Sequence, residues 1–233
     1  KTGHSLTING AISLSVFPSI GLKVKDISLS GYTGFENKPL ITAKEVSISA
    51  KLFPLLLKRL ETKSISFTQA QVTLVRDAQG KTNWQGLIVG NSKSPQNIKT
   101  GSSVKQAGDN NEDADANVKF DIATIKLVDS SIAYTDAQTG DNYYFSNINI
   151  NSSGISKHEL EQLHVSFDYY PDSQKKRKPA KIIFTSSVKT SESLDSILFE
   201  KFTLQIGKMT LHGHLNTSLG ESGQTLTGTL KTN

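Results

Sequence analysis

The chain of 233 residues contains no cysteine and only one tryptophan, and 20% of its residues are charged. The absence of cysteine excludes disulfide bonds, thiolate zinc sites and cysteine nucleophiles. Long apolar runs are also absent. The longest lies within residues 52–57, is interrupted by Pro54, and is far shorter than the roughly 20 residues that a membrane-spanning helix needs. The sequence therefore contains no predicted transmembrane helix.

The chain begins at Lys1 rather than at a methionine, and no charged segment followed by an apolar one opens it. We therefore expect an upstream segment, with any targeting signal, to be missing. The net charge of +5 is a modest excess for a protein that binds nucleic acid. Basic residues do not alternate with aromatic residues along a strand face, so no nucleic acid partner is expected.

Apolar residues alternate with serine, threonine, asparagine, glutamine and lysine along most of the chain, as in Ile20, Leu22 and Val24. Such a period of two predicts strands with one apolar face. Glycine and aspartate punctuate the runs, for example at Gly31 and Gly140, which is typical of antiparallel sheets. The predicted fold class is therefore mainly β.

Helical spacing is confined to two short segments. Residues 52–60 place leucines on one face, and Pro54 falls where a first helical turn tolerates proline. A weaker candidate covers residues 191–198. The sequence thus predicts one or two short helices beside the sheet.

A change of composition divides the chain. Residues 90–117 are rich in serine, asparagine, glutamine, lysine, glycine and aspartate and have almost no large apolar side chain. Such a segment buries too little surface to offset the entropy of ordering it, so it is predicted to be a flexible polar loop. The predicted organisation is a β unit at residues 1–89, this loop, and a second β unit at residues 118–233.

The two units share a pattern. Apolar residues at positions i, i+2, i+7 and i+9 are followed by an Asp-Ala-Gln sequence and then a glycine. This arrangement occurs twice, about sixty residues apart. The members are Ile65, Phe67, Val72 and Leu74 before Asp77, and Ile125, Leu127, Ile132 and Tyr134 before Asp136. The spacing alone returns at Ile20, Leu22, Ile27 and Leu29, and at Phe202, Leu204, Met209 and Leu211.

In this pattern the first apolar pair (i and i+2) is separated from the second (i+7 and i+9) by the odd number seven. In a regular strand the two pairs would therefore point to opposite faces, so they share one face only if the chain turns or bulges between them. A two-residue turn at Asp129 and Ser130 would pair Ile125 with Tyr134, and Ile206 with Gly207 would form a similar turn. Gln69 with Ala70 and Val24 with Lys25 are poor turn residues, so a bulged continuous strand is the better device there. The sequence leaves these alternatives open.

The sequence contains partial matches to known phosphate-binding and metal-binding motifs, but each match lacks an essential residue. Gly80-Lys81-Thr82 lacks the first glycine of a phosphate-binding loop, and His212 with His214 lack a third ligand nearby. The acidic residues between 109 and 115 lack the alternation of a calcium-binding loop. No catalytic residue, metal site or cofactor is therefore predicted.

One basic cluster has two interpretations. Lys175, Lys176, Arg177 and Lys178 form either a solvated hairpin tip or a contact for anionic lipid headgroups.

Residues 7–87 resemble the N-terminal region of the AsmA family of bacterial envelope proteins. The resemblance is carried by Gly10, Phe17-Pro18-x-x-Gly21-Leu22, Gly34-Phe35, Lys51-Leu52-Phe53-Pro54-Leu55-Leu56 and Leu74-Val75-Arg76-Asp77-x-x-Gly80-x-x-Asn83-Trp84. It implies an elongated, curled sheet with an apolar groove, similar to the bridge-like lipid-transfer proteins. It also implies a periplasmic body and a missing N-terminal anchor helix in the inner membrane.

A sheet whose apolar face is not capped must close on itself or be covered by something else, and acyl chains are one such cover. The leading hypothesis is a non-enzymatic segment that binds a phospholipid or another envelope lipid between inner and outer membranes. The groove candidates are Val46, Ile48, Ile65, Phe67, Val72, Leu74, Ile125, Leu127, Ile132, Tyr134, Leu204 and Leu211. The alternative is a structural or assembly module with a closed β core that binds envelope proteins.

Overall fold

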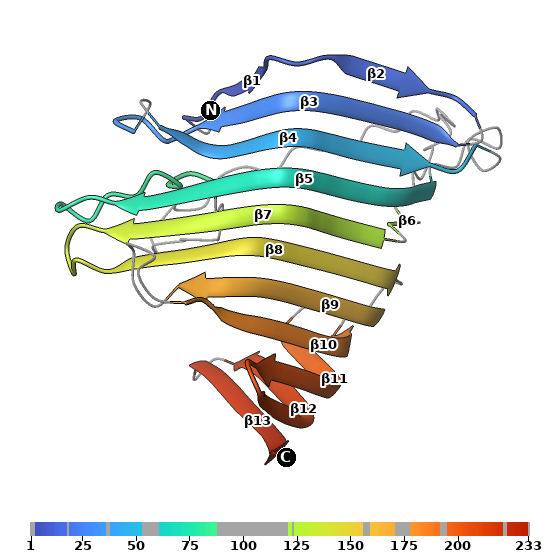
Figure 1. Ribbon diagram of the computed structural model, residues 1–233, viewed down its shortest axis with the longest axis vertical. Coiled ribbons are helices and arrows are strands. Elements are labelled where there is room, and N and C mark those ends of the chain that lie inside the picture. The colour runs from blue at the N-terminus through green and yellow to red at the C-terminus, as the bar shows by residue number, and fades with distance from the viewer. Residues whose placement is uncertain are drawn as a thin grey trace, which may run out of the picture.

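One continuous sheet accounts for nearly all of the chain that the structure describes (Figure 1). This computed structural model describes residues 3–17, 19–35, 38–52, 61–87, 121–122, 124–155, 159–170, 178–191, 195–220 and 223–232. Within these ranges, thirteen strands join in the order β1-β3-β4-β5-β7-β8-β9-β10-β11-β12-β13, with β2 also on β3 and β6 also on β5. The predicted β class is thus confirmed.

The strands follow the alternating segments of the sequence. Their bounds are β1 Leu6–Ile8, β2 Ile12–Ser15, β3 Ile20–Ser30, β4 Pro39–Ala50, β5 Glu61–Arg76, β6 Asp121–Ile122, β7 Thr124–Asp136, β8 Asn142–Ile155, β9 Glu159–Tyr170, β10 Ala180–Thr190, β11 Ser196–Ile206, β12 Met209–Gly220 and β13 Gly223–Thr232. The strands β3 to β8 bow near their middle, and the last strands are rotated relative to the first (Figure 1). Such rotation is the accumulated twist expected of an open sheet.

The sheet is mixed rather than antiparallel throughout, which corrects the sequence prediction. β5 pairs in parallel with β7 and with the short β6, whereas every other pair is antiparallel. Two parallel strands need a connection of a dozen residues or more, and the chain between β5 and β7 exceeds that length. Strands from both predicted units therefore meet in one sheet through the β5–β7 pair.

The two copies of the repeat lie side by side at this parallel pair. Ile65 pairs with Ile125, Phe67 with Leu127, Val72 with Ile132, Leu74 with Tyr134, and Arg76 with Asp136. The offset of sixty residues seen in the sequence is thus the register of the parallel strands.

The second predicted helix is wrong. β11 begins at Ser196, and Ile197 and Leu198 pair with Thr190 and Lys189 of β10. Ladder hydrogen bonds to β10 and β12 outweigh the weak helical spacing of three apolar residues. Of the first predicted helix, residues 53–60 lie outside the described part, so that prediction is not tested.

Five strand residues other than glycine have a left-handed backbone, with φ between 45° and 51°: Asp26, Gln69, Asp129, Asn147 and Lys201. Each lies inside a continuous strand. The continuous strands predicted near Val24 and Gln69 are therefore confirmed, but the pairing register does not shift at either place, so these are bends and not the predicted bulges. The turn predicted at Asp129 and Ser130 is wrong. The turn after β11 exists but lies one residue later, at Gly207 and Lys208, so Leu204 pairs with Leu211.

Each left-handed residue shifts the alternation by one position, which returns the next apolar side chains to the same face. Ring contacts show this directly at Lys201, because Phe199 before it and Phe202 after it both contact Phe184 of β10, with centroids 5.7 and 5.8 Å apart. The bend is also where burial is concentrated. Ala70, Ser130, Ile148 and Phe202 each directly follow a left-handed residue, and all are buried.

Candidate functional site: an open apolar face

One face of the sheet carries a continuous apolar row. Register partners present their side chains on the same face, so the pairings can be followed from strand to strand. The row that crosses nine strands, from β3 to β12, consists of Val24, Val46, Phe67, Leu127, Ile150, Val165, Phe184, Leu204 and Leu211. With strands about 4.8 Å apart, it extends over roughly 38 Å.

Further apolar rows flank this one. Leu22, Ile48, Ile65 and Ile125 form a row on one side, and Leu29, Ile41, Val72, Ile132, Phe145 and Tyr169 form a row on the other. All twelve groove candidates named from the sequence lie on this face. Ten of them are gathered on β4, β5 and β7, whereas Leu204 and Leu211 lie several strands away in the long row.

Side chains of this face remain half exposed. Phe67 is 37% exposed and Ile48 is 40% exposed, whereas Phe202 at the bend is 5% exposed. Extensive contacts between the described strands run only between sheet neighbours, so none of these strands packs over the face. In this part of the chain the sheet is a single layer and not the closed β core of the alternative hypothesis.

The opposite face is mainly polar, with serine, threonine, lysine and asparagine at the intervening positions. Val128 is an exception, 39% exposed beside Leu127 on the other face of β7. His212 and His214 also lie here, and each ring nitrogen Nδ1 is 3.0 Å from a threonine hydroxyl, of Thr203 and Thr229 respectively. Among the described residues, no group of three or more potential ligands could hold a metal ion.

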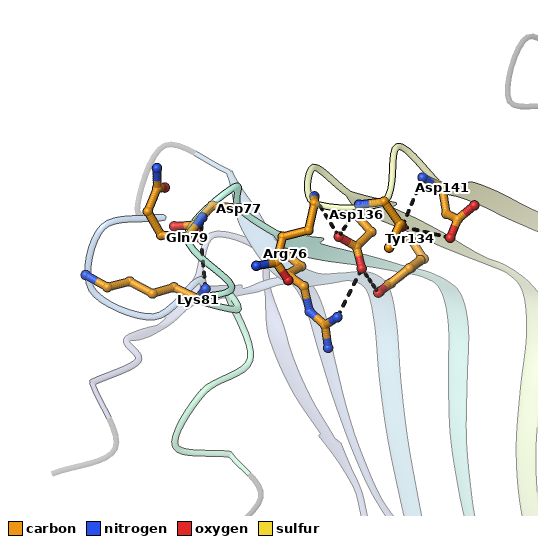
Figure 2. A network of polar contacts seen from close by, with 9 residues as sticks. Arg76, Asp77, Gln79, Lys81, Tyr134, Asp136 and Asp141 are labelled. Carbon is orange, nitrogen blue, oxygen red and sulfur yellow. Dashed lines mark hydrogen bonds and ion pairs between the residues drawn. The ribbon is translucent and has the colours of Figure 1, made fainter.

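At one end of the face, the two repeat copies finish in similar turns (Figure 2). Asp77 Oδ1 accepts hydrogen bonds from the backbone N–H groups of Gln79 and Lys81, at 2.9 and 2.8 Å. Asp136 Oδ1 accepts from the N–H groups of Gln138 and Thr139, at 2.9 and 3.3 Å. Each aspartate thus fixes the turn that follows its strand, which is the structural basis of the repeated Asp-Ala-Gln sequence.

An ion pair joins the two turns. Arg76 Nη1 lies 3.1 Å from Asp136 Oδ2, and the hydroxyl of Tyr134 donates to the same oxygen at 2.9 Å (Figure 2). Burial opposes ionisation of Asp136, but the hydrogen bonds from Gln138, Tyr134 and Thr139 and the charge of Arg76 hold its pKa below the usual value. The hydrogen bond to Asp136 in turn raises the pKa of Tyr134. Asp136 is therefore ionised, and its two carboxylate oxygens accept four hydrogen bonds.

Asn83 holds the free edge of β5. The register between β4 and β5 ends at Val72, so the backbone of β5 beyond it has no strand on that side. Asn83 Oδ1 accepts from the N–H of Val75 at 2.9 Å, and Asn83 Nδ2 donates to the carbonyl of Thr73 at 2.7 Å. The side chain is 1% exposed and replaces the missing ladder bonds.

Three aromatic rings stand next to this ion pair. The ring of Trp84 is 6.2 Å from that of Tyr134, which stacks at 5.9 Å on Tyr143 of β8. Tyr134 was predicted as a groove residue, whereas Trp84, Tyr143 and the Arg76–Asp136 pair were not predicted as site residues. The available signal was that both repeat copies end at this point, with Arg76 and Asp136 at equivalent positions.

The predicted headgroup contacts fall largely outside the described residues. Lys175, Lys176 and Arg177 are not described, and Lys178 is exposed just before β10. In the part of the chain that is described, no helix has the length and apolar character needed to cross a membrane.

Comparison with models of known protein families gives a match that covers nearly the whole chain. The model of the AsmA family matches residues 1–225. No curated protein matches the chain.

Proposed function

The chain belongs to the AsmA family, whose members are bacterial envelope proteins, and we propose that it is a non-enzymatic lipid-binding segment of the periplasm. Its open face would shield the acyl chains of a phospholipid, or of another envelope lipid, on the way between the inner and outer membranes. In this proposal the full-length protein is anchored in the inner membrane and also contacts other envelope proteins.

The observation that carries the proposal is the half-exposed apolar row across nine strands. Exposed apolar surface of this extent is unfavourable in water and marks a binding surface in soluble proteins. Its side chains offer only C–H groups, which can shield an acyl chain but cannot transfer a proton or attack a bond. This supports a binding role rather than catalysis.

The dimensions of the face also support lipid as the occupant. Along β5, the apolar positions from Ile65 to Leu74 span about 30 Å at 3.3 Å per residue. The hydrocarbon of one membrane leaflet is about half of a 30 Å core, so acyl chains fit along the strands. Each methylene removed from water contributes about 0.8 kcal/mol when fully buried.

Single aspartate substitutions on the two faces of β7 test the proposal. Leu127→Asp would place a carboxylate against acyl chains, whereas the open face lets water solvate that charge when lipid is absent. The matched control is Val128→Asp, the same chemical change on the next residue and on the opposite face. Phe67→Asp is the equivalent change on β5.

The measurement is lipid extraction from each purified protein, with mass spectrometry of the extract per mole of folded protein. Leu127→Asp and Phe67→Asp should keep the circular dichroism of the native sheet and lose most bound lipid, whereas Val128→Asp should retain it. Unfolding of both apolar-face variants would instead favour a closed structural module. A folded Leu127→Asp protein with normal lipid content would contradict the assigned face.

A further inference from the structure

The order of residues along β5 and β7 changes from apolar to aromatic to charged toward one end of the face. Val72 and Ile132 form one register pair, Leu74 and Tyr134 the next, and Arg76 and Asp136 the last. Because each pair is two residues further along, all three pairs lie on the same face. At 3.3 Å per residue, the charged pair lies about 13 Å beyond the Val72–Ile132 pair.

This order matches the long axis of a phospholipid, in which acyl chains lead to a glycerol region and then to a phosphate. We infer that Arg76 binds the phosphodiester of a phospholipid headgroup at this rim of the apolar face. The inference rests on the proposed lipid-binding function and extends it from a hydrocarbon surface to a lipid class.

Arg76 has the required free donors. Its guanidinium carries five N–H donors, and the structure gives it one partner, the Asp136 carboxylate at Nη1. Its Nε is buried and therefore out of reach of a ligand. The side chain as a whole is 39% exposed, so the donors left for a ligand are the N–H groups of the terminal nitrogens that Asp136 does not use. A planar guanidinium with free donors matches the two unesterified oxygens of a phosphodiester.

Asp136 is the positioning residue. Its side chain is 4% exposed, and its two oxygens already accept from Arg76, Tyr134, Gln138 and Thr139. It therefore orients the guanidinium and has no acceptor position left for a ligand cation. Figure 2 shows Arg76 and Tyr134 extending to the same side of the strands, with Asp136 between them.

The Trp84, Tyr134 and Tyr143 rings lie at the level between hydrocarbon and phosphate. Tyrosine and tryptophan favour such positions because one end of the ring system is apolar and the other is wet. Tyr143 is 41% exposed, so its ring is open to a ligand. Because Asp136 balances the charge of Arg76, selection at this rim depends on hydrogen bonds to phosphate and not on the net charge of the headgroup.

Trp84 is the only tryptophan of the chain, so its fluorescence reports directly on the rim. The probes are short-chain phosphatidylethanolamine, phosphatidylglycerol and diacylglycerol with equal acyl chains, each titrated as monomers into the purified, delipidated chain. The unmodified protein should bind both phospholipids roughly tenfold or more tightly than diacylglycerol, since hydrogen bonds to a charged donor are lost with the phosphate.

Arg76→Gln should remove this preference and leave diacylglycerol binding unchanged. Lys126→Gln, which removes a positive charge from the polar face of the neighbouring strand, should change nothing. If Arg76→Gln does not fold, Arg76→Lys keeps a cation beside Asp136 and should lose most of the preference, because an ammonium lacks the planar donor pair.

The outcomes distinguish the proposed lipid-binding function from the proposed phosphate subsite. If no lipid binds, the proposed function fails; if both phospholipids and diacylglycerol bind equally, only the phosphate subsite fails. An equal loss of all three ligands in Arg76→Gln would mean a purely structural ion pair and would overturn the inference. Titration with inorganic phosphate is the remaining arm. Saturation of the Trp84 signal by phosphate, without competition against phospholipid, would identify a site for the free ion instead of a headgroup.

Discussion

Gln69 and Asp129, the left-handed residues of two parallel strands, are joined by a hydrogen bond from Nε2 to Oδ2 of 3.1 Å. Directly after them, the N–H of Ala70 donates to the hydroxyl of Ser130 at 3.1 Å, and that hydroxyl donates to the carbonyl of Val128 at 3.1 Å. Side chains thus replace backbone bonds where the strands bend. The bend is therefore encoded by polar residues of both repeat copies, not by glycine.

Ser130→Ala should destabilise the protein by about 1–3 kcal/mol, because the buried N–H of Ala70 would lose its acceptor. The control is Ser131→Ala, the next residue of the same strand, which should have a much smaller effect. Urea unfolding of both variants measures the difference. Equal free energies of unfolding for the two variants would show that the hydroxyl of Ser130 is not needed at the bend.

Lys201→Gly should stabilise the protein by about 1 kcal/mol, since a left-handed backbone strains any residue with a Cβ. Lys201→Val should destabilise it, because a β-branched side chain tolerates this conformation least. Lys126 lies in an ordinary strand conformation, so Lys126→Gly should cost about 0.5–1 kcal/mol. The thermal midpoint should rise for Lys201→Gly and fall for Lys126→Gly and Lys201→Val, each relative to the unmodified protein.

The pKa of Asp136 is lowered in the folded protein, so its ionised form stabilises the fold. This contribution is present above the unfolded pKa of about 4 and disappears as the pH falls through the lower folded pKa. Asp136→Asn should reduce stability at neutral pH and flatten the loss of stability between about pH 4 and more acidic values. Denaturant unfolding at several pH values in this range measures the free energy of unfolding of both proteins. If its dependence on pH is the same in Asp136→Asn as in the unmodified protein, the prediction is wrong.

The parallel pairing of β5 and β7 sets a minimum length for their connection. The chain leaves beside Arg76, where Thr82 pairs with it, and returns at Asp121 beside Glu61. These ends of β5 are about 50 Å apart at 3.3 Å per residue, and an extended chain covers at most about 3.5 Å per residue.

Replacement of residues 90–117, which lie outside the described part, by about 20 glycine and serine residues should therefore leave the thermal midpoint nearly unchanged. Replacement by three residues would leave residues 83–89, the linker and residues 118–120 between Thr82 and Asp121, which reach only about 49 Å at full extension. Such a chain could span the distance only by releasing the hydrogen bonds of Asn83, so the β5–β7 pair should be strongly destabilised. A loss of several degrees with the longer linker would mean that the native segment packs on the sheet. The sequence predicted a flexible polar loop here without a length requirement, whereas the strand direction requires a minimum length.

The sequence predicted the strands and their apolar face because alternation is a local signal. Phe67 and Leu127 were correctly placed on one surface, since the offset of sixty residues linked two equivalent segments. The parallel direction of those strands could not be predicted, because it depends on pairing between distant segments and not on either segment alone.

Asp129 illustrates the ambiguity of a local signal. Aspartate tolerates a left-handed backbone both in a tight turn and inside a bent strand, and only the neighbouring strands decide between them. The ion pair of Arg76 and Asp136 was missed for a related reason, because the two residues are adjacent only once β5 and β7 have paired. Their contact is a feature of tertiary structure, so it cannot be derived from the two sequence positions alone.

A single layer in which each strand bonds only to its neighbours has no central core shared by all elements. Its cooperativity is therefore short-ranged, as in repeat proteins, where stability is a sum of local terms and interfaces between neighbours. Opening should begin at the outer strands β2 and β13, where Leu14 and Leu226 are largely exposed, and progress inward one strand at a time. Amide protection would then rise from both ends toward β5 and β7, so that this parallel pair is the last part of the sheet to exchange.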